Sequence, residues 1–347
     1  MLITSFLKSF LIYLWYLKKI LYDKDSLINS PCSLENINFQ LIDNQSEDPT
    51  ALNVIPYQNF PLFIARPEYQ FRHGVASGDS SSISTIFWTR ITPRNKVAKA
   101  SLIPVYFQLS TDQNFQNVHI SGITYTNSLI DFTIKLHIRN LEPNQSYYYR
   151  FYDEKNNEII GESKTLPNVI DNCSLIVTDS TKKLQTYNAS FVLQLNDFKN
   201  KVFTRLRDYR SRYAFEQRIP NVTVLYGSNP AMYYEDLTLT NYHRALLEWF
   251  PIRPPKIRVI GKTFKFGDKF HISFINHQQK TLNFEKYDNN AREDDFTELS
   301  YDVECRNQIQ IKSPLGITNI NLRDYKGILM LEINEDGVTV DNSTYVC

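Results

Sequence analysis

The stretch Phe132-Thr-Ile-Lys-Leu-His-Ile138 alternates apolar and polar side chains along its whole length. Alternation with a period of two is the pattern of a half-buried β-strand. Further short runs rich in β-branched and aromatic residues lie between turn residues on both sides of it: Ser84–Ile91, Val105–Ser110, Asn117–Thr126, Tyr147–Asp153 and Glu158–Thr165. Short strands separated by regular turn signals are typical of a β-sandwich, which we expect at about residues 68–167.

The corner between two of these runs has the sequence Asn140-Leu-Glu-Pro-Asn-Gln-Ser-Tyr-Tyr-Tyr-Arg150. It resembles the corner of fibronectin type III-like domains. The resemblance implies that Leu141 packs inward, that Pro143 and Asn144 reverse the chain, and that a tyrosine hydroxyl ties the corner to nearby backbone. We therefore interpret these tyrosines as core and corner residues rather than as a ligand cage.

The composition of the whole chain places it among soluble globular proteins. It has 347 residues, 42% hydrophobic and 22% charged, and a formal net charge of +1. These values exclude a disordered, collagenous or polytopic membrane protein. The balanced charge argues against nucleic acid as a partner, because phosphate neutralisation needs clustered Lys and Arg. Neither of the common glycine-rich phosphate-binding motifs occurs in the sequence.

The cysteines give no metal or redox motif. Cys32, Cys173, Cys305 and Cys347 lie too far apart for a C-x-x-C pair. They are either disulfide partners in an exported chain or thiols in a cytosolic one, and the sequence leaves the two alternatives open.

Residues 1–24 form a hydrophobic N-terminal segment, and residues 25–65 are polar and Asn-rich, as in a linker. Residues 2–21 are apolar apart from a few polar positions and the charges of Lys8, Lys18 and Lys19. They fit a membrane-spanning helix, an amphipathic helix at a membrane surface, or a buried terminal helix. As a cleavable signal they are poor, because the lysine pair follows the apolar run. We expect a membrane-associated or exported protein of the cell envelope, with a cytoplasmic location as the alternative.

Two strings in the middle of the chain carry a sharper resemblance. Phe71-Arg-His-Gly-Val-Ala-Ser-Gly-Asp79, followed by Ile86-Phe-Trp-Thr-Arg-Ile-Thr-Pro93, resembles the opening of the alkaline phosphatase D family of metallophosphoesterases. Further strings resemble the family in the same order: Asp131–Thr133, Gly161–Pro167, Leu206–Ala214, Tyr242–Arg253, Thr263–Asp268 and Asp324–Ile333. The resemblance implies an accessory N-terminal β-sandwich, to which His73 belongs, followed by a phosphatase domain with two metal ions.

From this resemblance we predict a fibronectin type III-like β-sandwich at residues 66–167, followed by an incomplete α/β metallophosphoesterase-like sandwich at residues 168–347. Strands are expected in this second part at Leu175–Thr178, Ser190–Leu195, Asn221–Tyr226, Phe270–Ile275 and Ile328–Ile333. Helices are expected at Lys201–Arg218 and Leu239–Trp249, the second ended by Pro251. The acidic stretch Asp288–Asp302 is interpreted as a surface loop.

Most of the metal ligands that the resemblance implies have been replaced. Ser180 stands where the family has a Cys, and in Gln194-Leu-Asn-Asp-Phe198 only Asp197 of the family's ligands remains. The string Val224-Leu-Tyr-Gly-Ser-Asn229 stands where the family has acidic residues and a His. No two of the six His residues have the spacing of a metal-binding pair, and we interpret His277 as a chance neighbour of Asn276.

Three hypotheses follow. In the first, the chain is a degenerate alkaline phosphatase D-like protein without phosphatase activity or cofactor, and Asp197 is the one residual metal ligand. In the second, it is a phosphoesterase that cleaves phosphate esters at a rearranged site with Ca, Fe, Zn or Mn, for which the residues to examine are Asp179, Asp197, Asn229 and Asp268. In the third, it is a β-sandwich interaction module anchored to a membrane through residues 2–21.

Overall fold

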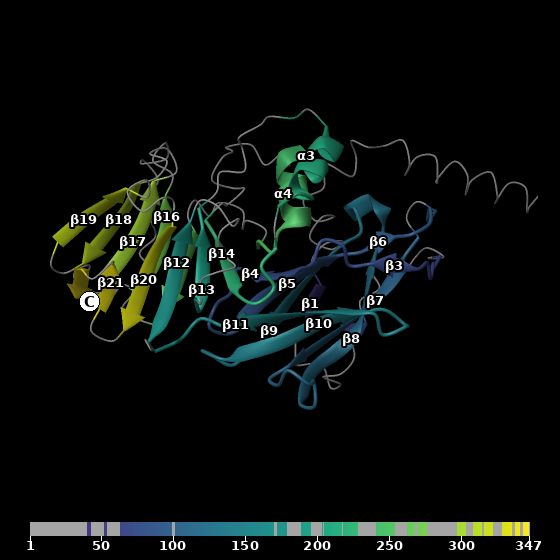
Figure 1. The fold of residues 1–347 in the computed structure, drawn as a ribbon, viewed down its shortest axis with the longest axis horizontal. Helices are drawn as coiled ribbons and strands as arrows, with labels where there is room; N and C mark the ends of the chain where they lie inside the picture. The colour runs from purple at the N-terminus through teal and green to yellow at the C-terminus, as the bar shows by residue number, and fades with distance from the viewer. Residues whose placement is uncertain are drawn as a thin grey trace, which may run out of the picture.

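The computed structural model describes residues 40–42, 52–53, 63–98, 101–169, 172–178, 189–195, 203, 205–216, 218–227, 241–253, 262–267, 270–275, 297–302, 308–313, 316–321, 328–334, 337–340 and 343–346. Within these residues the protein is mostly β-sheet with few helices, as expected. Figure 1 shows the strands of the N-terminal half on the right, those of the C-terminal half on the left, and two short helices above them.

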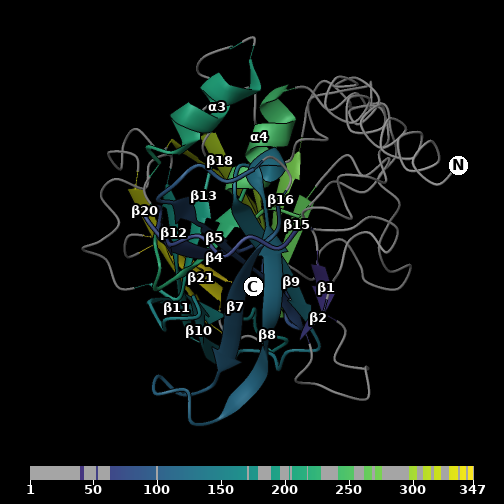
Figure 2. The same ribbon diagram turned by 90° about the vertical axis from the view of Figure 1, so that its right-hand side faces the viewer.

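Two β layers enclose the core of the N-terminal half (Figure 2). One layer contains, in spatial order, β11 (Glu158–Lys164), β10 (Ser146–Tyr152), β7 (Ile103–Ser110), β8 (Val118–Thr126) and β2 (Leu52–Asn53). The other contains β1 (Gln40–Ile42), β9 (Thr133–Arg139), β5 (Ser84–Arg90) and β4 (Val75–Gly78). A small pair, β3 (Tyr69–Gln70) and β6 (Thr92–Pro93), and the 3-10 helix η1 (Ser128–Ile130) complete this half.

Alternation places the apolar side chains of both layers in one core. Tyr147, Tyr149 and Phe151 of β10 point inward and pack with Phe87 of β5 and Phe107 of β7. The corner before β10 has the expected anchors: Leu141 is buried, and the backbone N–H of Glu142 donates to the Tyr147 hydroxyl at 3.0 Å. The predicted strands Ser84–Ile91 to Glu158–Thr165 are therefore confirmed with shifts of one or two residues at their ends.

A single ten-stranded sheet joins the two halves, which we did not predict. Strand β4 pairs in parallel with β14 (Thr223–Tyr226), and the sheet continues through β13 (Phe191–Gln194), β12 (Cys173–Thr178), β20 (Ile328–Asn334), β21 (Gly337–Val340) and β22 (Ser343–Val346). Strands β12, β13 and β14 are mutually parallel, and β20 runs antiparallel to β12. The strands predicted for the C-terminal half are present within two residues of their expected bounds.

A second five-stranded sheet contains β15 (Lys262–Phe266), β16 (Phe270–Ile275), β17 (Thr297–Asp302), β18 (Gln308–Ser313) and β19 (Gly316–Asn321). Phe266 and Phe270 from this sheet pack with Leu175 and Phe191 of the ten-stranded sheet. The interpretation of Asp288–Asp302 as a surface loop is wrong for its last residues, because Thr297–Asp302 pairs on both sides, with β16 and β18.

The two helices cover the opposite face of the ten-stranded sheet. Helix α3 (Leu206–Tyr213) is shorter than the predicted Lys201–Arg218, and α4 (Asn241–Trp249) begins close to the predicted start. Tyr213, Trp249 and Phe250 pack there with Trp88 of β5. Among the described residues no helix is long and apolar enough to cross a membrane, and the segment 1–24 lies outside them.

Candidate functional site

Three parallel strands end side by side at the edge where a phosphatase site was expected. Thr178, Gln194 and Tyr226, the last residues of β12, β13 and β14, are neighbours in register. The backbone N–H of Leu195 donates to the Thr178 carbonyl at 2.8 Å, and that of Gly227 to the Gln194 carbonyl at 2.9 Å. In open sheets of parallel strands, ligands bind beyond these carboxyl ends.

The candidate ligands lie outside the described residues: Asp179, Asp197 and Asn229, which follow these strand ends in the sequence, and Asp268, between β15 and β16. Ser180, at the position of the family's Cys, and His277, interpreted as a chance neighbour of Asn276, also lie outside them. The structure therefore neither brings them together nor separates them. Among the residues that it does describe, no group of three or more His, Cys, Asp and Glu side chains could hold a metal ion.

Tyr226, at the end of β14, is a core residue. Its side chain is 3% exposed and its ring lies 5.7 Å from that of Phe250, edge to face. Burial raises the pKa of the phenol, although the charge of Arg218 opposes the shift, so the hydroxyl stays protonated in the physiological pH range. This position contributes packing rather than a negatively charged oxygen ligand.

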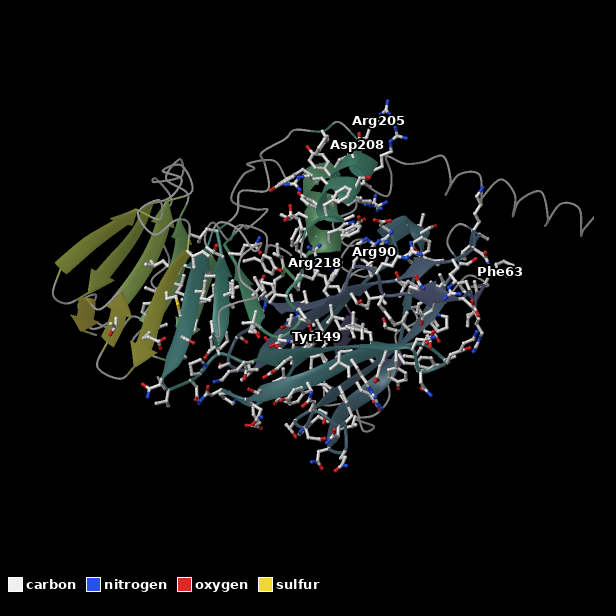
Figure 3. All side chains as sticks on the ribbon, in the orientation of Figure 1. Phe63, Arg90, Tyr149, Arg205, Asp208 and Arg218 are labelled. Carbon is white, nitrogen blue, oxygen red and sulfur yellow. The ribbon has the colours of Figure 1, made fainter. Side chains whose placement is uncertain are left out.

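Beside Tyr226 lies a buried cation, Arg218, which Figure 3 places below α4. Its guanidinium carbon lies 4.7 Å from the ring centre of Trp88 and 4.6 Å from that of Phe250. The guanidinium donates to the backbone carbonyls of Trp249 at 2.9 Å and Glu216 at 3.0 Å. Burial lowers its pKa to about 10, which leaves it charged at neutral pH. Aromatic faces and carbonyl oxygens compensate this charge.

His73, the histidine of the first family-like string, belongs to a cluster on the N-terminal half. Its Nδ1 lies 3.3 Å from Nη1 of Arg90, and its ring lies edge to face on Trp249 at 5.1 Å. Arg90 pairs with Asp131 at 3.0 Å, and the other Asp131 oxygen accepts from the Trp249 indole at 3.1 Å. Burial, strengthened by Arg90, lowers the pKa of His73 to about 4, so the imidazole is neutral at pH 7. His73 thus contacts Arg90 and Trp249 within this cluster.

A second ion pair network joins the two helices. The carboxylate of Glu248 on α4 is completely buried and accepts from Nε and Nη2 of Arg210 on α3, at 2.6 and 2.7 Å. Arg244 donates to the same carboxylate at 3.0 Å. Both arginines also donate to the carbonyl of Leu129 in η1 at 2.9 Å. Glu248 and its two arginine partners therefore link α3, α4 and the N-terminal half.

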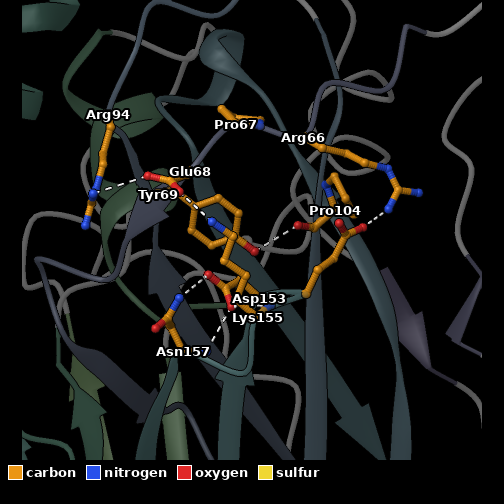
Figure 4. A pocket seen from close by; sticks show the side chains of 10 residues that line it. Arg66, Pro67, Glu68, Tyr69, Arg94, Pro104, Asp153, Lys155 and Asn157 are labelled. Carbon is orange, nitrogen blue, oxygen red and sulfur yellow. Dashed lines mark hydrogen bonds and ion pairs between the residues drawn. The ribbon is translucent and has the colours of Figure 1, made fainter.

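An exposed pocket lies at the far end of the N-terminal half, with a volume of about 360 Å³ (Figure 4). Glu68 at its edge accepts from Lys155 at 2.5 Å and from Arg94 at 3.2 Å, and Arg66 pairs with Glu154. These ion pairs are largely exposed to solvent and balance one another. We assign the pocket no role in the chemistry of the strand ends, because β3, which contributes Tyr69 to it, lies away from β12 and β13 in Figure 1.

Comparisons with known proteins agree with the resemblance. Residues 61–167 match the family model of the PhoD-like phosphatase, N-terminal domain. Alkaline phosphatase D of Bacillus subtilis (strain 168) is 28% identical over 149 residues, which are 42% of this chain and 24% of that protein. The chain thus matches about a quarter of the length of this curated relative. Through residues 61–167 the chain is related to the alkaline phosphatase D-like family.

Among solved structures, one titled "Structure of PhoD" is 19% identical, with a TM-score of 0.47 over 63% of this chain and 53% of that chain. The structure of the purple acid phosphatase PPD1 from yellow lupin seeds has 10% identity and a TM-score of 0.34, over 63% of this chain and 46% of that chain. Neither likeness is close enough to transfer a site to this chain.

Proposed function

We propose that this chain is a degenerate alkaline phosphatase D-like protein: a PhoD-like scaffold without phosphatase activity, which acts by binding rather than by catalysis. The proposal includes a fibronectin type III-like fold for residues 66–167 and a reduced metallophosphoesterase fold for residues 168–347. One observation supports it above all. At the end of β14, where the family has acidic ligands, this chain has Tyr226, and its side chain is packed in the core.

The chemistry of a dinuclear centre explains why this replacement matters. Two metal ions that clamp a phosphate need several oxygen and nitrogen ligands converging from neighbouring strand ends. The described residues at these ends, Thr178, Gln194 and Tyr226, are uncharged, and two of them precede single carboxylates in the sequence, Asp179 and Asp197. The described donor set does not fit two metal ions, and a lone Asp197 would hold a cation only weakly.

The test is a joint measurement of metal content and turnover on the purified full chain. Metal is determined by mass spectrometry, and hydrolysis of aryl phosphate mono- and diesters is followed with Mn²⁺, Fe³⁺, Zn²⁺ or Ca²⁺ supplied. We expect less than one bound metal per chain and no turnover above a buffer control. Turnover that Asp197→Ala abolishes and Asp208→Ala leaves intact would refute the proposal, since Asp208 is half-exposed on α3, in a weak pair with Arg207.

The alternative is a phosphoesterase with a rearranged site. It is favoured by the oxygen ligands that the sequence offers: Asp179, Asp197 and Asn229 follow the three strand ends that are in register, and Asp268 precedes β16. In that case substitution of each residue by Ala should lower turnover and metal content together. If only one of the four has this effect, a shared site is excluded.

A membrane-anchored interaction module remains a further candidate for the same scaffold, supported by the apolar segment 2–21. Cell fractionation of the full chain and of a chain lacking residues 2–21 tests it. Recovery of both chains in the soluble fraction would contradict a membrane anchor.

A further inference from the structure

The strings that resemble the phosphatase family meet at one surface between the two halves of the chain. We call it the docking surface. Its residues from the N-terminal half (63–169) are Gly78, Asp79, Trp88 and Asp131, and those from the C-terminal half (172–346) are Thr223, Arg218, Trp249 and Arg253. Six of these eight positions come from the family-like strings, and Arg218 and Thr223 lie in the sequence between two of the strings, so the fold brings together residues from separate parts of the chain.

The centre of the docking surface is a strand pair. Ser77 and Gly78 of β4 are in register with Thr223 and Val224 of β14, and the N–H of Asp79 donates to the Val224 carbonyl at 3.2 Å. A Cβ on Gly78 would lie 2.8 Å from the carbonyl oxygens of Val224 and Pro251. Only glycine allows this approach, and the contact has the form of strand addition to a sheet edge.

The other β layer holds the same strand from the side. The Thr223 hydroxyl donates to the carbonyl of Lys164 in β11 at 3.0 Å and accepts from its N–H at 2.7 Å. The N–H of Glu162 donates to the Pro220 carbonyl at 2.7 Å. Strand β14 is thus bound by both layers of the N-terminal half.

On the side of the helices, indole and charged side chains connect the two halves. The Trp88 indole donates to the Glu248 carbonyl at 2.8 Å, while Arg218 stacks on its ring. Asp79 accepts from the N–H of Arg253 at 2.7 Å, and the Arg253 side chain donates to Ser84 at 2.6 Å. Buried aromatic and arginine anchors are characteristic of tight protein–protein interfaces.

We infer that the docking surface is a recognition interface in its own right: the C-terminal half binds the N-terminal half as a protein partner, and the covalent connection near residue 169 is not what holds them together. The partner that fits β14 is a sheet edge with a glycine at its centre, a carboxylate beside it and an indole on the neighbouring strand. This inference is independent of whether the strand ends have phosphatase activity.

The experiment uses the full chain with a protease site inserted after Val169, whose side chain is 69% exposed. The chain is purified intact, cleaved, and analysed by gel filtration and native mass spectrometry. We expect the cleaved halves to elute together at the mass of one chain. Separation of the halves at micromolar concentration would overturn the inference.

Two substitutions on the docking surface and one outside it make the test specific. Gly78→Val should abolish co-elution after cleavage. Arg253→Gln should weaken the affinity between the cleaved halves at least tenfold. This variant provides the test if Gly78→Val does not fold. Ile83→Ser is the matched control on the same half, because this side chain is 54% exposed, and co-elution should be unchanged. Equal behaviour of Arg253→Gln and Ile83→Ser would overturn the inference.

Discussion

The buried carboxylate of Glu248 offers the sharpest test of how the helices are held. Glu248→Gln keeps the size of the side chain but removes the charge that compensates Arg210 and Arg244. Breaking a buried ion pair by removing one partner costs roughly 3–5 kcal/mol. Arg210 and Arg244 are 17% and 24% exposed and keep their hydrogen bonds to the Leu129 carbonyl. We therefore expect the free energy of unfolding to fall by an amount at the lower end of this range, about 3 kcal/mol.

The assay is urea denaturation at pH 7, followed by tryptophan fluorescence, because Trp249 is the last residue of α4 and Trp88 lies in the same buried cluster. Glu216→Gln is the matched control. Its partner Arg212 is 52% exposed, so Glu216→Gln should lower the free energy of unfolding by less than about 1 kcal/mol. Added salt should reduce the effect of Glu216→Gln and leave that of Glu248→Gln nearly unchanged. Equal losses from the two substitutions would refute the assigned role of Glu248.

Two further predictions concern the N-terminal half. Gly161→Ala should lower the free energy of unfolding by about 1–3 kcal/mol, because a Cβ there would lie 2.5 Å from the Tyr149 ring; an unchanged denaturation midpoint would contradict this packing. Burial and the charge of Arg253 lower the pKa of His137 to about 3 in the native state. Below pH 6.5 the imidazole is therefore protonated in the unfolded chain and stays neutral in the native protein. The free energy of unfolding should therefore fall by up to about 2 kcal/mol between pH 7 and pH 5, and the fall should be smaller in His137→Gln.

The sequence allowed most strands to be predicted and left their pairing open. Strands such as β9 could be recognised from their alternation. The prediction that β9 is half-buried is wrong, because its polar side chains are buried as well, and Lys135 donates to the Leu247 carbonyl of α4. The pairing of β4 with β14 could not, since β4 is four residues long and its partner is chosen by packing with distant residues. Strand β17, Thr297–Asp302, was missed because its polar composition resembles that of a loop.

Of the candidate site, only the strand ends that frame it can be compared with the prediction, because the candidate ligands lie outside the described residues. The register of Thr178, Gln194 and Tyr226 agrees with the expected meeting of three strand ends. That the Tyr226 side chain packs against Phe250 could not be read from spacing, because it depends on the helix layer that covers this face. The structure also assigns packing and charge contacts to Arg218, which no motif had singled out, and to Glu248, which the string Tyr242–Arg253 contained without a role.

The ten-stranded sheet has a consequence for how the protein is made. During synthesis the chain emerges from its N-terminus, so β4 leaves the ribosome long before Val224, the residue with which Gly78 pairs. Until then one edge of the N-terminal half has no strand to pair with, and unpaired edges are prone to associate with other chains. The interval between these two residues is therefore the period in which the newly made protein is most exposed to aggregation, and slower translation across it should lower the yield of soluble chain.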